Sequence, residues 1–184
     1  MKTFISLAIA SLLTITSAPG AQASSQGEGV VTLGGVVVDS ACGLEAGTAD
    51  QTIVMPPEPV GRLLRLARGA PHPFQLRLVN CSLSREDPLR PGVPLPDWQH
   101  LRVTFDGPSD REGRSFAVSG GSQGVAFHIE DAAGQESVPG QPMALLPIVE
   151  GDMTLHYRLY LVGNGLPLVV GSHGAAVRFK LEYF

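Results

Sequence analysis

The strongest constraint on the fold comes from the C-terminal residues, where apolar and polar side chains alternate one by one. The apolar set is Val177, Phe179, Leu181 and Tyr183, and the intervening set is Arg178, Lys180, Glu182 and Phe184. This alternation predicts a β-strand with one buried face. Nothing follows Phe184 in the sequence, so we expect no further strand of the same chain to cover this strand's outer edge. Because an open sheet edge is a template for strand addition, we expect it to pair with another chain.

The N-terminal segment, residues 1–23, has the pattern of a secretory signal peptide. Lys2 is followed by a mostly apolar run over residues 4–16, and Ala21 and Ala23 form a small-x-small cleavage pattern. The run is shorter than the roughly 20 residues that a membrane anchor needs. We therefore expect export and a mature chain that begins at Ser24.

A second alternating stretch lies directly behind the expected cleavage site, at Gly27, Gly29, Val31 and Leu33. The pattern predicts a strand-like N-terminal end that is free to pair with another chain. A disordered end with chance alternation is the alternative.

The chain has two cysteines, Cys42 and Cys81. In the oxidising compartment that export implies, we expect them to form a disulfide. Closing a loop of about 40 residues would stabilise the fold by roughly 4 kcal/mol. A metal pair or a catalytic thiol is the alternative, but neither cysteine has a histidine or a second cysteine at ligand spacing.

Many short alternating segments separated by turns predict an all-β sandwich, and the 22 glycines and 15 prolines favour it. We expect a reversal at Gly163-Asn164-Gly165 between the last two strands, one or two helical turns at residues 63–68, and an exposed loop at residues 88–96. The expected strands cover residues 35–40, 51–55, 74–81, 101–105, 115–118, 125–130, 154–162 and 175–183.

The residues that carry chemistry form no recognisable catalytic pattern, and no histidine pairs with another at metal-ligand spacing. Asp106, Asp110 and Glu112 could bind calcium, but a solvated turn is favoured because they lack the spacing of a calcium loop. The net charge of −4, without a basic stripe, argues against nucleic acid. We expect no catalytic residue, cofactor, metal or small-molecule substrate.

Several of these segments together resemble the pilin subunits of chaperone–usher fimbriae of Gram-negative bacteria. The similar segments are VTLGGVVVDSAC at residues 31–42, ADQTI at 49–53, FQLRLVNC at 74–81, and the closing segment 171–183 with its penultimate tyrosine. Each is weakly specific alone; the signal peptide, the cysteine spacing and the terminal tyrosine together are more specific.

This resemblance implies an incomplete immunoglobulin-like fold (the pilin fold) over residues 35–184, in which a missing strand leaves a groove. It implies a donor-strand arm over residues 24–34, with Val31 and Leu33 inserting and Gly29 as the small residue. It also implies that Val177, Phe179, Leu181 and Tyr183 line the groove edge and that the Phe184 carboxylate is a charged anchor. A periplasmic chaperone fills the groove first, and the arm of the next subunit replaces it at the outer-membrane usher.

The segments LRVTFDG at residues 101–107 and FAVSG at 116–120 resemble minor subunits close to the P-pilus terminator, which ends growth and anchors the rod. We therefore expect a minor structural subunit on the cell surface that supports pilus biogenesis and cell adhesion. The prolines at residues 56–59 and the loop at 88–98 depart from the usual pattern and could reshape one end of the groove. An ordinary shaft pilin is the first alternative. A self-sufficient periplasmic β-sandwich that binds a ligand is another, and a periplasmic enzyme comes last.

Overall fold

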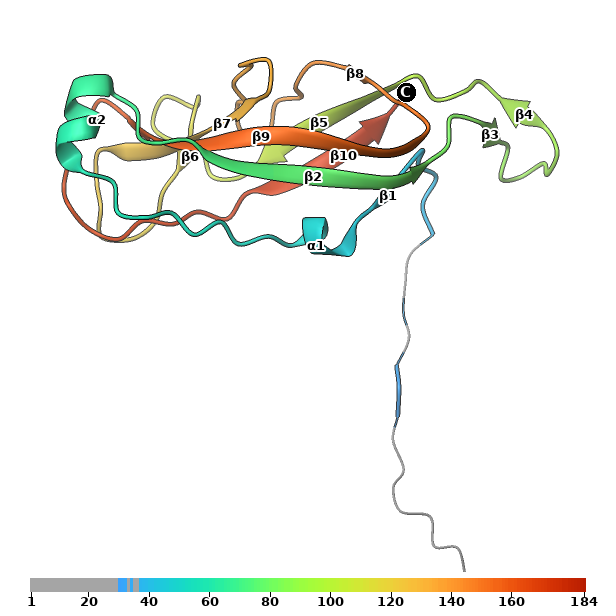
Figure 1. Cartoon of the computed structure of the whole chain (residues 1–184), viewed down its shortest axis with the longest axis horizontal. Coiled ribbons are helices and arrows are strands. Elements are labelled where there is room, and N and C mark those ends of the chain that lie inside the picture. Colours follow the sequence, from blue (N-terminus) through green and yellow to red (C-terminus); the bar gives the residue numbers. More distant parts are fainter. Residues whose placement is uncertain (1–29, 33, 35–36) are drawn as a thin grey trace, which may run out of the picture. The chain divides into compact units, whose positions relative to one another are not determined.

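The computed structural model describes residues 30–32, 34 and 37–184 (Figure 1). The chain divides into a first unit, residues 1–37, and a second, residues 38–184, which holds every described helix and strand. Val31 has no regular secondary structure and is exposed. The expected signal peptide, Gly29 and Leu33 lie outside the described residues.

Two antiparallel sheets form the second unit (Figure 1). The first sheet has the order β1-β2-β9-β7-β6, and the second has the order β10-β5-β8. A two-stranded hairpin, β3-β4, is separate from both. The bounds are β1 Gly43–Leu44, β2 His72–Cys81, β3 Arg85–Glu86, β4 Pro94–Leu95, β5 His100–Asp106, β6 Phe116–Ala117, β7 Val125–Asp131, β8 Leu146–Pro147, β9 Gly151–Gly163 and β10 Arg178–Tyr183.

The core lies between the two sheets, because alternate residues of the strands point inward. Leu76 and Leu78 of β2 and Leu101 and Val103 of β5 are almost fully buried in one cluster. The disulfide between Cys42 and Cys81 is part of that cluster and closes a sequence separation of 39 residues. The expected all-β sandwich and its disulfide are therefore confirmed.

Two short helices lie outside the sheets, α1 over Ala46–Ala49 and α2 over Val60–Leu66. The expected helical turns at residues 63–68 thus correspond to α2, which begins three residues earlier. The helix ends at Ala67, which has a φ of 53° and donates its backbone N–H to the Leu63 carbonyl at 2.8 Å. No described helix is long and apolar enough to cross a membrane.

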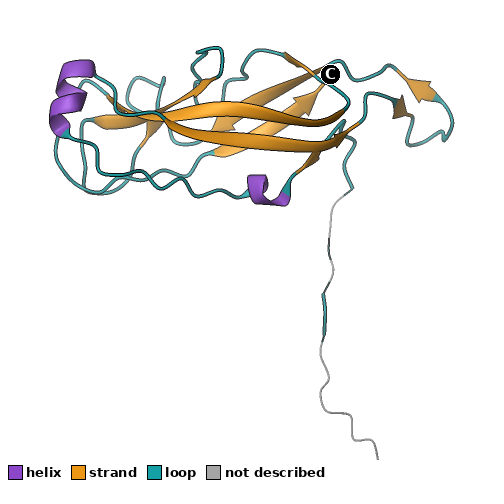
Figure 2. Ribbon diagram, viewed as in Figure 1, coloured by secondary structure: helices purple, strands orange, loops and turns teal. Residues whose placement is uncertain are grey.

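Three sequence expectations need correction. Of the strand expected at 35–40, residues 35 and 36 lie outside the described residues; residues 37–40, and the whole of 51–55, form no strand, because no described strand hydrogen-bonds to them (Figure 2). The turn at Gly163-Asn164-Gly165 exists, since the Leu166 N–H donates to the Asn164 side chain at 3.2 Å and Gly165 has a φ of +79°. However, the strands on either side of it, β9 and β10, lie in different sheets.

Candidate functional site: an open groove beside the last strand

A large apolar groove opens between the edges of the two sheets. Its volume is about 1200 Å³, and its lining includes Leu44 of β1 and Phe179 of β10. One side is the segment 48–57, which connects α1 towards α2, and the other is the segment 171–179. Both edge strands, β1 and β10, lack a second neighbour among the described strands. A further strand inserted here would complete the sandwich.

The groove is lined by aromatic side chains from four strands, including Phe127 of β7. Phe105 of β5 packs edge-to-face against Tyr157 of β9, with ring centroids 5.0 Å apart, and Phe74 of β2 stacks on the same tyrosine at 5.4 Å. Phe179 of β10 lies 6.5 Å from Phe105. Phe74, Phe105 and Phe179 line the groove, and because Phe74 and Phe179 are only half-buried, a partner strand would cover apolar surface that now contacts water.

The register of β10 shows which backbone groups face the open edge. His100 and Phe184 exchange two backbone hydrogen bonds, at 3.0 and 2.8 Å. In an antiparallel ladder the hydrogen-bonded pairs recur at every second residue. The even-numbered residues of β10 therefore bond to β5, and the odd-numbered ones, Phe179, Leu181 and Tyr183, direct their N–H and C=O groups to the free edge.

The side chains of β10 also alternate, as the sequence predicts. Val177, Phe179, Leu181 and Tyr183 are half-buried against the core, and Arg178 and Lys180 are exposed. Only Val177 and Phe179 of the apolar set line the groove. Burial raises the pKa of the Tyr183 hydroxyl.

Charged and aromatic groups surround the C-terminal residue. One backbone oxygen of Phe184 accepts N–H bonds from Gln99 and His100, and the Arg102 guanidinium lies 4.8 Å from the Phe184 ring centroid. The Lys180 ammonium donates to Glu182 at 2.9 Å and, as the largest cause, holds the pKa of that carboxyl below its ordinary value. The C-terminus therefore lies within a mixed field of positive and negative side chains.

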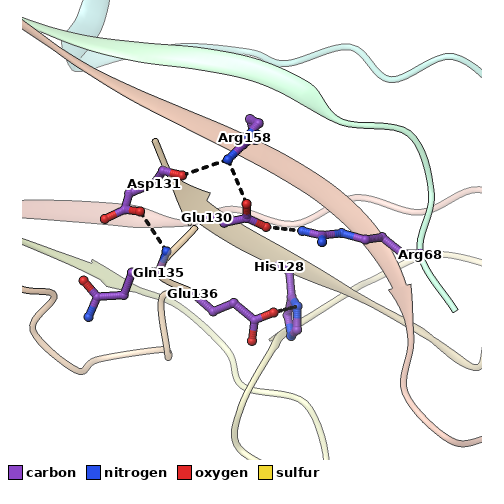
Figure 3. A network of polar contacts seen from close by, with 7 residues as sticks. All are labelled: Arg68, His128, Glu130, Asp131, Gln135, Glu136 and Arg158. Carbon is purple, nitrogen blue, oxygen red and sulfur yellow. Dashed lines mark hydrogen bonds and ion pairs between the residues drawn. The ribbon is translucent and has the colours of Figure 1, made fainter. Parts of the chain in front are cut away.

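A separate polar cluster joins β7, β9 and Arg68, two residues after α2 (Figure 3). Glu130, which is 7% exposed, accepts a hydrogen bond from Arg158 at 2.8 Å and another from Arg68. Arg158 also donates to the Asp131 carbonyl at 3.2 Å, and the Arg68 guanidinium lies 3.5 Å from the Tyr160 ring centroid. Because two guanidinium groups satisfy this buried carboxylate, the cluster serves to hold strands together.

Two of the three acidic residues weighed as calcium ligands, Asp106 and Asp110, have other partners. One Asp110 oxygen accepts the backbone N–H groups of Arg114 and Ser115, both at 3.1 Å, which is a turn cap. Asp106 pairs with Arg178 at 3.3 Å. Across the described residues no group of three or more His, Cys, Asp or Glu side chains is placed to hold a metal ion.

The sequence located the strand beside the groove but missed the groove's floor. Phe74 and Phe105 were expected simply as members of alternating strands. Residues that line the groove alternate with polar residues in the same way as residues of the closed core do. No sequence signal therefore separates groove residues from core residues. Leu44 was missed because β1 is only two residues long.

Comparison with known proteins identifies the family. The chain is 33% identical over 156 residues to the PRS fimbrial minor pilin protein of Escherichia coli, covering 85% of this chain and 77% of that protein. The PAP fimbrial minor pilin protein of the same species is 32% identical over the same length. The Fimbria A protein of Serratia marcescens is 28% identical over 178 residues, covering 95% of each chain. A scan of protein-family models finds no match.

Solved structures agree on the fold. A subunit in a structure of a chaperone–usher pilus superposes with a TM-score of 0.71 at 24% identity, covering 89% of this chain and all (100%) of the other. The P pilus rod subunit PapA superposes with a TM-score of 0.65 at 20% identity, covering 79% of this chain and 100% of that one. The solved structures therefore share the fold of this chain, and the sequence relatives are fimbrial pilins by name. The chain belongs to the family of fimbrial pilins and has an incomplete immunoglobulin-like pilin fold.

Proposed function

We propose that this protein is a minor subunit of a chaperone–usher fimbria and is assembled by strand addition. The groove accepts an extended strand from a partner, and the arm over residues 24–34 is donated to the groove of a neighbour. The observation that carries this proposal is the open groove of about 1200 Å³ beside the free edge of β10. In this scheme the protein is structural and has no catalytic role.

The groove has the chemistry that strand addition requires. Phe179, Leu181 and Tyr183 offer backbone donors and acceptors for main-chain hydrogen bonds, and the aromatic floor offers contacts for alternate side chains. The nine contiguous residues 171–179 line one side. The arm over residues 24–34 is long enough to run beside them in an extended conformation.

We assign the first occupant to a periplasmic chaperone. A partner strand that lies beside β10 would cover the apolar surface before assembly, and cationic groups of the chaperone would hold the Phe184 carboxylate. In a subunit that accepts an arm, the arm of a neighbouring subunit then replaces the chaperone strand at the outer-membrane usher. Val31 and Leu33 of this chain's own arm insert into the groove of its neighbour, with Gly29 as the small residue. The protein thus travels through the periplasm to the cell-surface fimbria.

Within the fimbria we assign a terminator-like role, which the similarity to two fimbrial minor pilins supports. The openness of the groove favours a second candidate, a shaft or adaptor subunit that accepts the arm of the next subunit. The two candidates differ in one property. A terminator keeps its chaperone when an arm of another subunit is present, whereas a shaft or adaptor subunit exchanges the chaperone strand for that arm.

The test is strand exchange on the mature chain purified in complex with its chaperone. The added probe is a peptide that copies the N-terminal arm of a rod subunit, and the control is the same peptide with aspartate at its alternating apolar positions. Retention of the chaperone with both peptides supports the terminator role, and replacement by the apolar peptide alone supports the shaft or adaptor role. A protein that forms no chaperone complex and is soluble alone refutes assembly by strand addition.

A further inference from the structure

One end of the groove is crossed by a chain of contacts that links its two sides. Asp39, just before β1, pairs with Arg85 at 2.6 Å. The Arg85 guanidinium lies 4.0 Å from the Trp98 ring centroid. Trp98 packs edge-to-face against Tyr183 near the end of β10, with centroids 6.1 Å apart. The contacts therefore run from the β1 edge of the first sheet to the β10 edge of the second.

A β-bulge turns Trp98 inward. Gln99 and His100 both donate their backbone N–H groups to one backbone oxygen of Phe184, at 2.7 and 3.0 Å, so two residues of one strand face one of the other. Such a bulge changes the side to which the preceding side chain points. Without it, Trp98 would share the outward side of His100. With it, the indole is half-buried against the core.

The groove ends where this chain of contacts begins. Its lining includes Val177 and Phe179 but neither Leu181 nor Tyr183, although all four share one face of β10. Trp98 occupies the space beside Tyr183, and Arg85, whose side chain is only 29% exposed, covers one face of the indole.

We propose that Trp98, held in place by Arg85 and Asp39, closes the C-terminal end of the groove and thereby limits how far along β10 a partner strand can insert side chains. Trp98 is thus a specificity-determining residue for the partner strand. The partner's backbone can continue beside Leu181 and Tyr183, but a bulky side chain opposite Tyr183 finds no room. This inference rests on the proposed function, in which the groove accepts an extended strand from a neighbouring subunit.

The test compares two strand lengths on one protein. The mature chain, unfolded in urea with its disulfide intact, is refolded with an excess of competing peptides, and the bound peptides are quantified by mass spectrometry. The short peptide copies residues 24–34. Two extended peptides carry an added Ser-Val, one at each end, because only one end lies beside Tyr183. Refolding avoids any need for the chaperone to be exchanged.

In the wild-type protein we expect the three peptides to bind within about twofold of one another. In Trp98→Ala, one extended peptide should be favoured over the short one by at least about tenfold, because burying a valine side chain in the vacated space is worth that much. Arg85→Ala should shift the ratio in the same direction but less, and Trp98→Phe should hardly shift it. The matched control is Arg90→Ala, which removes an exposed ion pair with Asp87 at 2.7 Å in the segment between β3 and β4.

Each result bears on a different statement. Failure of the short peptide to support refolding of the wild-type protein contradicts the proposal that the groove accepts an arm, which is the part of the proposed function on which this inference rests. If the short peptide supports refolding but Trp98→Ala leaves all ratios unchanged, the groove is not limited by Trp98 and this inference is wrong. A uniform loss of all complexes in Trp98→Ala, with unchanged ratios, has the same meaning, since a merely structural role lowers every yield equally.

Discussion

Replacing Leu181 by proline tests whether strand addition occurs at the free edge of β10. The N–H of Leu181 faces away from β5, so Leu181→Pro removes no hydrogen bond within the subunit. Proline is tolerated at an edge where its missing N–H would face solvent. A carbonyl group of the partner strand, however, would lose the Leu181 N–H as its donor and would remain without a hydrogen bond.

The expected loss is about 1–3 kcal/mol of binding free energy for the unsatisfied carbonyl. That loss corresponds to roughly 5- to 150-fold weaker binding of the partner strand. Two controls separate the causes. Leu181→Ala keeps the N–H and removes only side-chain packing, and Lys180→Pro removes an N–H that bonds inside the sheet, where Lys180 is opposite Thr104.

The assay is fluorescence anisotropy of a labelled strand peptide, together with a urea titration of the subunit without peptide. Leu181→Pro should weaken peptide binding more than Leu181→Ala does and leave the urea midpoint nearly unchanged, whereas Lys180→Pro should lower the midpoint. Unchanged peptide affinity in Leu181→Pro would refute the register derived for β10, because it would mean that no partner bonds to that N–H.

Three further predictions concern the fold. Cys81→Ser should destabilise the domain by roughly 4 kcal/mol, seen as a lower urea midpoint than that of the oxidised wild type, and an equal midpoint would contradict a structural role for the disulfide. Gly171→Ala should cost about 1–3 kcal/mol, because its Cβ would lie 2.4 Å from the Gly121 carbonyl carbon, whereas Gly174→Ala, with nothing within 4 Å, should cost much less in the same thermal unfolding experiment. The pKa of Tyr157 is raised above 10.0, chiefly by burial and then by the charge of Asp131. The contribution of this shift to the free energy of unfolding is therefore complete below pH 10 and is lost as the pH rises further. Tyr157→Phe should remove a slope of up to about 1.4 kcal/mol per pH unit from a plot of unfolding free energy against alkaline pH, and identical slopes in the two proteins would contradict this.

The long strands of the core could be predicted because apolar and polar side chains alternate along much of their length, and burial alternates throughout β5. The expected strand at residues 101–105 became β5 over His100–Asp106, and that at 154–162 became β9 over Gly151–Gly163. Burial on one face is recorded directly in such a pattern. The short strands β1, β3, β4 and β8 have two residues each, too few for a period to be recognised.

The inward position of Trp98 could not be predicted for a different reason. Counting back from Leu101 by alternation places Trp98 on the outward side, and only the bulge at Gln99 and His100 reverses it. The bulge depends on a hydrogen bond to Phe184, 84 residues further along the chain than His100, and no local pattern encodes it.

The incorrect strand at residues 51–55 is itself informative about the groove. Ile53 and Met55 are half-buried and Val54 is 84% exposed, so the side chains alternate as in a strand. What is missing is a hydrogen-bonding neighbour, since the segment lines the groove opposite β10. Alternation reports which side of an extended segment is apolar, but a strand exists only when another strand bonds to it. The segment therefore has the side chains of a strand but lacks a neighbouring strand. We expect this combination in a sandwich that a second chain completes. On the proposed function, this segment becomes ordered as a strand when the partner strand is in place.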